Sequence, residues 1–138
     1  MHRLFLDANV LFSAAYRTDA GLLKLWKLSE VTLCSSRYAL AEAEFNLPEE
    51  AQRNRLARLA AAFQIVDAAS RDLPRGVSLP DKDVPILLAA MEARATHLLT
   101  GDVRHFGPYF GKTVEGIEIL TPGEYLRRIR SRKEGGLT

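Results

Sequence analysis

The chain has 138 residues, enough for one domain with a hydrophobic core and too few for two ordinary domains. A hydrophobic fraction of 47%, a charged fraction of 26% and a net charge of only +2 exclude an intrinsically disordered chain. We expect one domain over residues 1–133, followed by a disordered tail over residues 134–138.

Targeting and cysteine patterns point to the cytoplasm. No apolar run is long enough to span a bilayer, and the N-terminus lacks the long apolar region and cleavage site of a signal peptide. Cys34 is the only cysteine, which excludes an intramolecular disulfide, and its apolar neighbours predict a small buried side chain. We therefore expect a cytoplasmic protein that makes no membrane contact.

The first half of the chain predicts three strands separated by helices. The strands are expected over residues 3–6, 31–34 and 63–66. Asp19 is expected to cap a helix after the first strand, because Leu22, Leu25 and Trp26 share one helical face.

Two helices are expected between the second and third strands. Ser35 or Ser36 caps the first helix, which ends near Leu47, and the second helix covers residues 49–63, a segment rich in strong helix formers. Residues 68–80 combine serine, glycine and proline and therefore predict a surface loop.

The second half predicts two more strands and two more helices. A buried helix face runs from Val84 to Met91, strands are expected over residues 96–100 and 117–120, and a last helix opens at Pro122. This alternation predicts an α/β fold in which helices cover both faces of a central parallel sheet of four to five strands.

Asp7 directly follows the first predicted strand. A charge at the end of an apolar strand costs solvation energy unless an ion or hydrogen bonds compensate it. No helix pattern begins directly at Ala8, which disfavours a capping role for Asp7. Ligands bind at the carboxyl ends of strands in open α/β sheets, so Asp7 is a candidate binding residue. Ser13 is expected either to hydrogen-bond this carboxylate or a phosphate, or to be an ordinary helix serine.

Other carboxylates occupy comparable positions. Asp102 follows the strand over residues 96–100, and it shares a crevice with Asp7 if the two strands are neighbours. Two further candidates each have an alternative two residues away. One is Asp81 or Asp83, which precede a predicted helix, and the other is Glu42 or Glu44, which lie within a predicted helix. The spacing of the residues does not decide within either pair.

Carboxylates held close together repel one another, so such a cluster needs cations or protons. Oxygen ligands without a set of histidine or cysteine ligands point to Mg²⁺ or Mn²⁺. The chemistry that uses this kind of cluster is phosphodiester hydrolysis.

Capping is the structural alternative for aspartates that precede helices. It is expected for Asp81 more than for Asp83, and it also fits Asp102. His105 is either a phosphate contact or general acid, or a loop side chain that packs on Phe106.

Four segments in order carry a family resemblance: Leu6–Ala14, Ser36–Glu42, Asp83–Leu87 and Leu99–Asp102. Together they resemble the PIN-domain ribonucleases, especially the VapC-like toxins, over nearly the whole chain from Leu4 to about Leu126. In the second segment an acid follows a serine by six residues, and this pattern of the family favours Glu42 over Glu44.

The resemblance implies a three-layer PIN-like fold and an endoribonuclease that depends on Mg²⁺ or Mn²⁺ and leaves a 5′-phosphate and a 3′-hydroxyl. The implied catalytic residues and metal ligands are Asp7, Glu42, Asp83 and Asp102. The expected supporting polar residues are Asn9, Ser13 and Thr100.

The resemblance also implies partners. Arg104 and His105 are expected to contact RNA, whose charged backbone supplies affinity without sequence choice. Two clusters of arginines are expected to do the same: Arg53, Arg55 and Arg58, and Arg127, Arg128, Arg130 and Arg132. The family implies a homodimer and, for toxin members, an antitoxin protein that blocks the acidic pocket.

Two other functions compete with this hypothesis. The first is a catalytically weak PIN-fold module that binds RNA or a partner, since activity does not follow from fold. The second is an aspartyl-phosphate phosphotransferase of the haloacid dehalogenase type, which needs a second aspartate where this chain has Asn9. The presence of all four acidic residues disfavours the inactive module, and Asn9 disfavours the phosphotransferase. The nuclease is therefore the preferred hypothesis.

Overall fold

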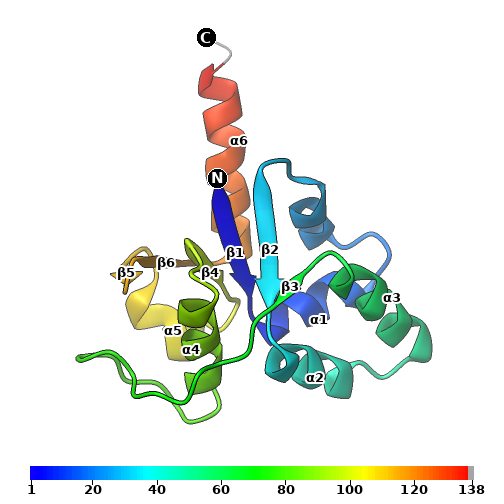
Figure 1. Cartoon of the computed structure of the whole chain (residues 1–138). Helices are drawn as coiled ribbons and strands as arrows, with labels where there is room; N and C mark the ends of the chain where they lie inside the picture. Colours follow the sequence, from blue (N-terminus) through cyan, green and yellow to red (C-terminus); the bar gives the residue numbers. More distant parts are fainter. Residues whose placement is uncertain (137–138) are drawn as a thin grey trace.

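The computed structural model describes residues 1–136, and their side chains through Arg132. Helices and strands alternate along the chain, as the sequence predicted (Figure 1). The strands are β1 (His2–Leu6), β2 (Val31–Ser35), β3 (Gln64–Ile65), β4 (His97–Leu99), β5 (Thr113–Val114) and β6 (Ile117–Leu120). The helices are α1 (Ala8–Tyr16), α2 (Arg37–Asn46), α3 (Glu50–Ala60), α4 (Val84–Glu92), α5 (Val103–Phe106) and α6 (Pro122–Gly136), with 3-10 turns η1 (Gly21–Lys27) and η2 (Gly107–Tyr109).

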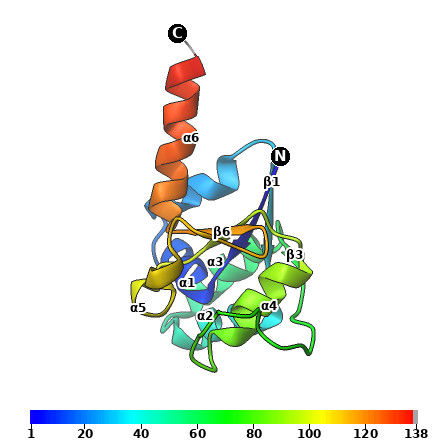
Figure 2. The same ribbon diagram turned by 90° about the vertical axis from the view of Figure 1, so that its left-hand side faces the viewer.

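The strands form one six-stranded sheet in the order β3-β2-β1-β4-β6-β5. All pairs are parallel except β5 with β6. Helices η1, α1 and α6 lie on one side of the sheet and α4 on the other (Figures 1 and 2). The predicted α/β class is therefore confirmed.

The sheet has one strand more than the sequence predicted. The additional strand, β5, is a two-residue segment that pairs with β6 across a tight hairpin. Glu115 and Gly116 connect the two strands with φ values of 50° and 79°. A two-residue turn with positive φ at both positions suits the twist of a hairpin, so β5 needs no apolar run of its own.

Helix α1 begins at Ala8, directly after β1 and Asp7. The expectation that no helix starts there was wrong, because Ala8, Leu11 and Ala15 form a buried face within a segment that follows the strand without a linker. The helix expected after Asp19 is the 3-10 turn η1. Its N-cap is Ala20 rather than Asp19, whose carboxylate instead pairs with Arg17.

The remaining helices follow the predicted pattern with adjusted ends. Ser36 caps α2 by accepting a hydrogen bond from the backbone of Ala39, whereas the Ser35 hydroxyl donates to the backbone of Leu6. Residues 68–80 lie in a loop, as predicted. Helix α6 continues to Gly136, past the predicted domain end at residue 133; residues 137–138 of the expected tail lie outside the described part of the chain.

The core lies on both faces of β1 and β4, where Phe5, Leu6, Leu98 and Leu99 are fully buried. Cys34 is also fully buried, as predicted. None of the described helices is both long and apolar enough to cross a membrane.

The strand order reverses between β1 and β4. From β1 the chain builds outward through β2 and β3 on one side, and β4 and β6 lie on the other. The pairing of Leu6 with Leu99 brings the residues after both strands to the same edge of the sheet. In open α/β sheets a ligand crevice forms at such a switch point.

Candidate acidic site

Asp7 lies at this switch point and is only 3% exposed. Its Oδ1 accepts a hydrogen bond from the backbone of Ala8 (2.7 Å), and its Oδ2 accepts from Thr100 (2.8 Å) and Asn9 (3.3 Å). Burial raises its pKa to about 6, and the charges of Asp83 and Glu42 add to this rise, while the bonds from Thr100 and Ala8 oppose it. Asp7 therefore both caps α1 and holds a destabilised charge.

Thr100 and Asn9 connect the two sides of the crevice. The Thr100 hydroxyl also accepts from the backbone of Asp102 at 3.0 Å, and Asn9 Oδ1 accepts from the backbone of Gly101 at 2.7 Å. A Cβ atom at Gly101 would lie 3.2 Å from Asn9 Oδ1, so this approach of side chain to backbone favours glycine. These bonds fix the start of the segment that carries Asp102.

Asp83 stands at the N-cap position of α4, yet its side chain makes no capping hydrogen bond. The prediction that Asp81 caps this helix was wrong, because Asp83 occupies the N-cap position of α4. Asp83 is 5% exposed, and burial, followed by the charge of Asp102, raises the pKa of its carboxyl group. A buried carboxylate that does not cap its helix is costly unless another group compensates it.

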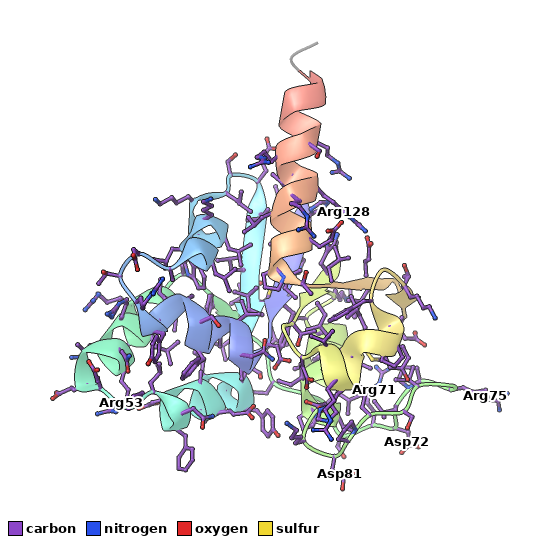
Figure 3. The ribbon with its side chains drawn as sticks, turned by 180° about the vertical axis from the view of Figure 1, so that it is seen from behind. Arg53, Arg71, Asp72, Arg75, Asp81 and Arg128 are labelled. Atoms are coloured by element: carbon purple, nitrogen blue, oxygen red, sulfur yellow. The ribbon has the colours of Figure 1, made fainter. Side chains whose placement is uncertain are left out.

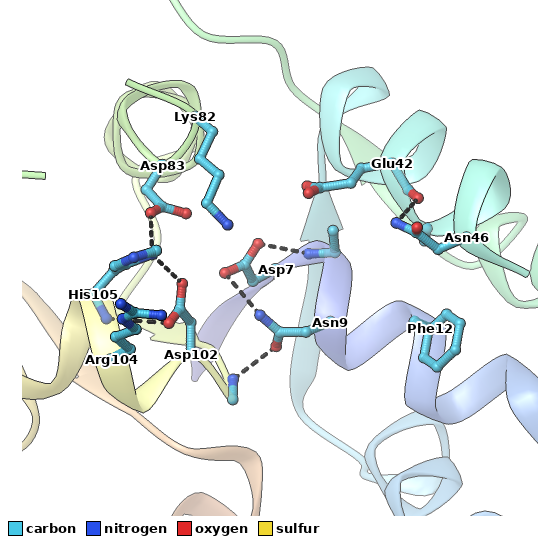
Figure 4. A pocket seen from close by; sticks show the side chains of 13 residues that line it. Asp7, Asn9, Phe12, Glu42, Asn46, Lys82, Asp83, Asp102, Arg104 and His105 are labelled. Atoms are coloured by element: carbon cyan, nitrogen blue, oxygen red, sulfur yellow. Dashed lines mark hydrogen bonds and ion pairs between the residues drawn. The ribbon is translucent and has the colours of Figure 1, made fainter. Parts of the chain in front are cut away.

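His105 lies between two carboxylates. Its Nδ1 is 2.8 Å from Asp83 Oδ2 and 2.9 Å from Asp102 Oδ2 (Figure 4). Asp102 also caps α5 by accepting from the backbone of His105 at 3.1 Å, as the structural alternative predicted. The ring nitrogen thus faces the acidic site.

Helix α2 carries Glu42 into the same pocket. Glu42 is half-buried, whereas Glu44 is exposed and lines a separate hollow between α2 and α3. Asp81 is exposed and points outward from the loop before α4 (Figure 3). The fold therefore brings Glu42 and Asp83 to the pocket and leaves Glu44 and Asp81 outside it.

The pocket has a volume of about 660 Å³ and receives side chains from four separate segments (Figure 4). The carboxylates of Asp7, Glu42, Asp83 and Asp102 face its interior. Among its larger lining side chains, Phe12, Asn46 and Lys82 were not predicted from the sequence. Asn46 is one helical turn after Glu42, and that spacing was the available signal.

Not every expected residue reaches the pocket. Ser13 is exposed, lines a different hollow on α1, and is not among the described hydrogen-bond partners of Asp7. Arg104 is exposed at the pocket rim. The arginines of α6 lie elsewhere, because α6 projects past the N-terminal end of β1 while Asp7 follows its C-terminal end (Figure 1). On this helix Arg127 and Arg128 pair with Glu124 and Glu118.

The donor atoms fit a divalent cation. Single ligand atoms of Asp83, Asp102 and His105 lie within 4.8 Å of one another. Apart from its 2.8 Å approach to His105 Nδ1, the buried Oδ2 of Asp83 has no partner among the described residues. A cation would compensate that atom and the crowded negative charge, and carboxylate oxygens are the ligands that Mg²⁺ and Mn²⁺ prefer.

Residues 3–104, which contain all four pocket carboxylates, match a family model described as PIN domain. The chain belongs to the PIN-domain family. This confirms the resemblance found in the sequence motifs. PIN domains are generally nucleases and typically use divalent metal ions.

A solved structure supports the PIN fold. A chain in the crystal structure of VapBC2 from Rickettsia felis, bound to a DNA fragment from its promoter, is similar with a TM-score of 0.64. The identity is 18%, and the similarity covers 86% of this chain and 98% of the other. A comparison with the curated proteins gives no match.

Proposed function

We propose that this PIN domain is an endoribonuclease that hydrolyses RNA phosphodiester bonds with Mg²⁺ or Mn²⁺. The observation that carries the proposal is the convergence of Asp7, Glu42, Asp83 and Asp102, from four separate segments, on one pocket. Two of these carboxyl groups have raised pKa values, and burial is the largest cause for both. Groups so perturbed in a cleft are typical of functional sites.

In this proposal the four carboxylates hold the metal, whose chemistry when bound is to activate water and neutralise phosphate charge. The other residues prepare the site. Thr100 and Asn9 orient the Asp7 carboxylate through the hydrogen bonds described above. Lys82 and Arg104, both exposed at the pocket, are suited to hold the RNA phosphates.

Cleavage assays test the proposal directly. Wild-type protein and Asp7→Asn are compared on single-stranded and structured RNAs in the presence of Mn²⁺. We expect cleavage by the wild type and none by the variant, with both proteins folded by circular dichroism. Equal behaviour of the two proteins would refute the nuclease and favour the catalytically weak RNA-binding or partner-binding module.

We further propose that the chain acts as the toxin of a toxin–antitoxin pair. The support is its family membership and the fold that it shares with a chain of a VapBC complex. Co-expression with the product of an adjacent reading frame should give a complex that does not cleave RNA. Free, fully active nuclease in that experiment would contradict the toxin assignment. The homodimer stays a prediction, which sedimentation analysis tests.

A further inference from the structure

His105 is fixed next to two of the acidic residues by both its backbone and its ring. The side chain of Asp102 accepts from the His105 backbone at 3.1 Å, so the start of α5 places the imidazole beside that carboxylate. The ring nitrogen Nδ1 then reaches Asp83 at the start of α4, twenty-two residues earlier in the chain (Figure 4). His105 is one residue beyond the segment that matches the PIN model, so its role is inferred from geometry.

A hydrogen bond alone does not account for this arrangement. Nδ1 carries at most one hydrogen, whereas two carboxylate oxygens approach it, Asp102 Oδ2 at 2.9 Å and Asp83 Oδ2 at 2.8 Å. One hydrogen cannot serve both oxygens well, and the buried Asp83 Oδ2 has no partner other than this nitrogen among the described residues. Leaving a buried carboxylate oxygen unsatisfied is costly. A third partner that contacts all three atoms would remove that cost.

The two distances from Nδ1 to the carboxylate oxygens suit an octahedral cation, and all three residues offer ligand atoms within 4.8 Å of one another. Adjacent ligands of an octahedral ion with bonds of about 2.1 Å lie about 3 Å apart. The distances from Nδ1 to the two carboxylate oxygens are 2.8 Å and 2.9 Å. With its hydrogen on Nε2, the imidazole presents the Nδ1 lone pair to the same space as the two oxygens.

We propose that His105 Nδ1 is a direct metal ligand beside Asp83 and Asp102, and that it makes the site prefer Mn²⁺ to Mg²⁺. This inference rests on the metal site of the proposed function. Mg²⁺ favours oxygen ligands, whereas imidazole nitrogen binds first-row transition ions more strongly. The histidine therefore shifts the selectivity of a site that carboxylates alone would leave open to both ions.

Two measurements on untagged full-length protein test the inference. Electron spin echo envelope modulation on the Mn²⁺-loaded protein detects nitrogen bound to the ion. Isothermal titration with Mn²⁺ and with Mg²⁺ gives the selectivity. We expect nitrogen modulation in the wild type, and its loss in His105→Gln. The variant should bind Mn²⁺ at least about tenfold more weakly, a loss typical of perturbed metal sites, while Mg²⁺ affinity changes much less.

His2→Gln is the matched control, because His2 lies at the opposite end of the sheet and hydrogen-bonds Tyr125. It should keep both the modulation and the affinities. Wild-type protein that binds Mn²⁺ without nitrogen modulation would overturn the inference, and so would equal losses of Mn²⁺ and Mg²⁺ affinity in His105→Gln. If wild-type protein without nitrogen modulation still cleaves RNA, the nuclease proposal survives and only the histidine ligand is refuted. If the wild-type protein binds no divalent ion, both the nuclease proposal and this inference fail.

Discussion

The hydroxyl of Thr100 donates a 2.8 Å hydrogen bond to Asp7, joining the ends of two strands whose residues are 93 positions apart. The same hydroxyl accepts from the backbone of Asp102. One fully buried side chain thus holds two of the four pocket carboxylates in relation to each other. The relative position of Asp7 and Asp102 therefore depends on the pairing of β1 with β4.

Thr100→Val should lower both stability and cleavage. Valine keeps the shape but leaves buried polar groups of Asp7 and Asp102 without their partner, at a cost of about 1–3 kcal/mol. Thr96→Val is the control, since Thr96 makes similar bonds with the backbone of Arg3 at the other end of β4. Denaturant unfolding should show a lower free energy of unfolding in both variants. Only Thr100→Val should also have a lower cleavage rate per molecule of folded protein. Equal cleavage by the two would contradict a role for Thr100 in the site.

Asp7→Asn should change how stability depends on pH when divalent ions are absent. The folded-state pKa of Asp7 is about 6 and its ordinary value is 3.8. Between these values the unfolded chain loses this proton before the folded chain does, so wild-type stability falls as the pH rises. Below this window the group has no effect, and above it the full loss persists.

The stability difference between Asp7→Asn and the wild type should therefore shift in favour of the variant by about 3 kcal/mol across this window, since one pKa unit corresponds to about 1.4 kcal/mol. Urea unfolding of both proteins in EDTA at a series of pH values measures this difference in the free energy of unfolding. A difference that stays constant from pH 4 to 7 would show that the buried charge is not destabilising.

Glu42→Gln and Glu44→Gln form a matched pair on α2. Glu42 lines the acidic pocket and Glu44 faces the hollow between α2 and α3. Removing one ligand charge should reduce cleavage in Mn²⁺ by at least about tenfold for Glu42→Gln. Glu44→Gln should cleave like the wild type. The reverse ranking would mean that the second motif is offset by two residues.

Asp83→Asn and Asp81→Asn separate the other pair through thermal stability. A ligand that binds only the folded state raises the melting temperature. Saturating Mn²⁺ should raise it for the wild type and Asp81→Asn, because Asp81 is exposed outside the pocket. Asp83→Asn should show a much smaller rise. An undiminished rise in Asp83→Asn would exclude Asp83 as a metal ligand.

Arg104→Gln should weaken RNA binding uniformly across sequences. A phosphate contact contributes about 1 to the slope of log affinity against log salt concentration, and the variant should lose that amount. Arg127→Gln is the control, because Arg127 pairs with Glu124 on α6. Fluorescence anisotropy with a catalytically inactive background, Asp7→Asn, measures both. An unchanged slope for Arg104→Gln would place Arg104 outside the RNA path.

Local patterns predicted most elements and the acidic motifs. The alternation of apolar runs with helical spacing predicts the parallel sheet, since both periods are properties of neighbouring residues. The missed elements are the ones whose pattern is very short or continues directly from a neighbouring strand. Helix α1 follows β1 without a linker, and β5 is two residues long and exists because a hairpin returns it to β6.

The sequence by itself determined that Asp7 and Asp102 follow strands and that acidic residues occur in four ordered motifs. Only the tertiary structure decided that β1 and β4 are neighbours, which places these two aspartates in one crevice. It also decided that the side chain of Glu42 rather than Glu44 lines the pocket, and that His105 lies beside Asp83. Such choices depend on packing between segments distant in the chain, and local spacing carries no information about that packing.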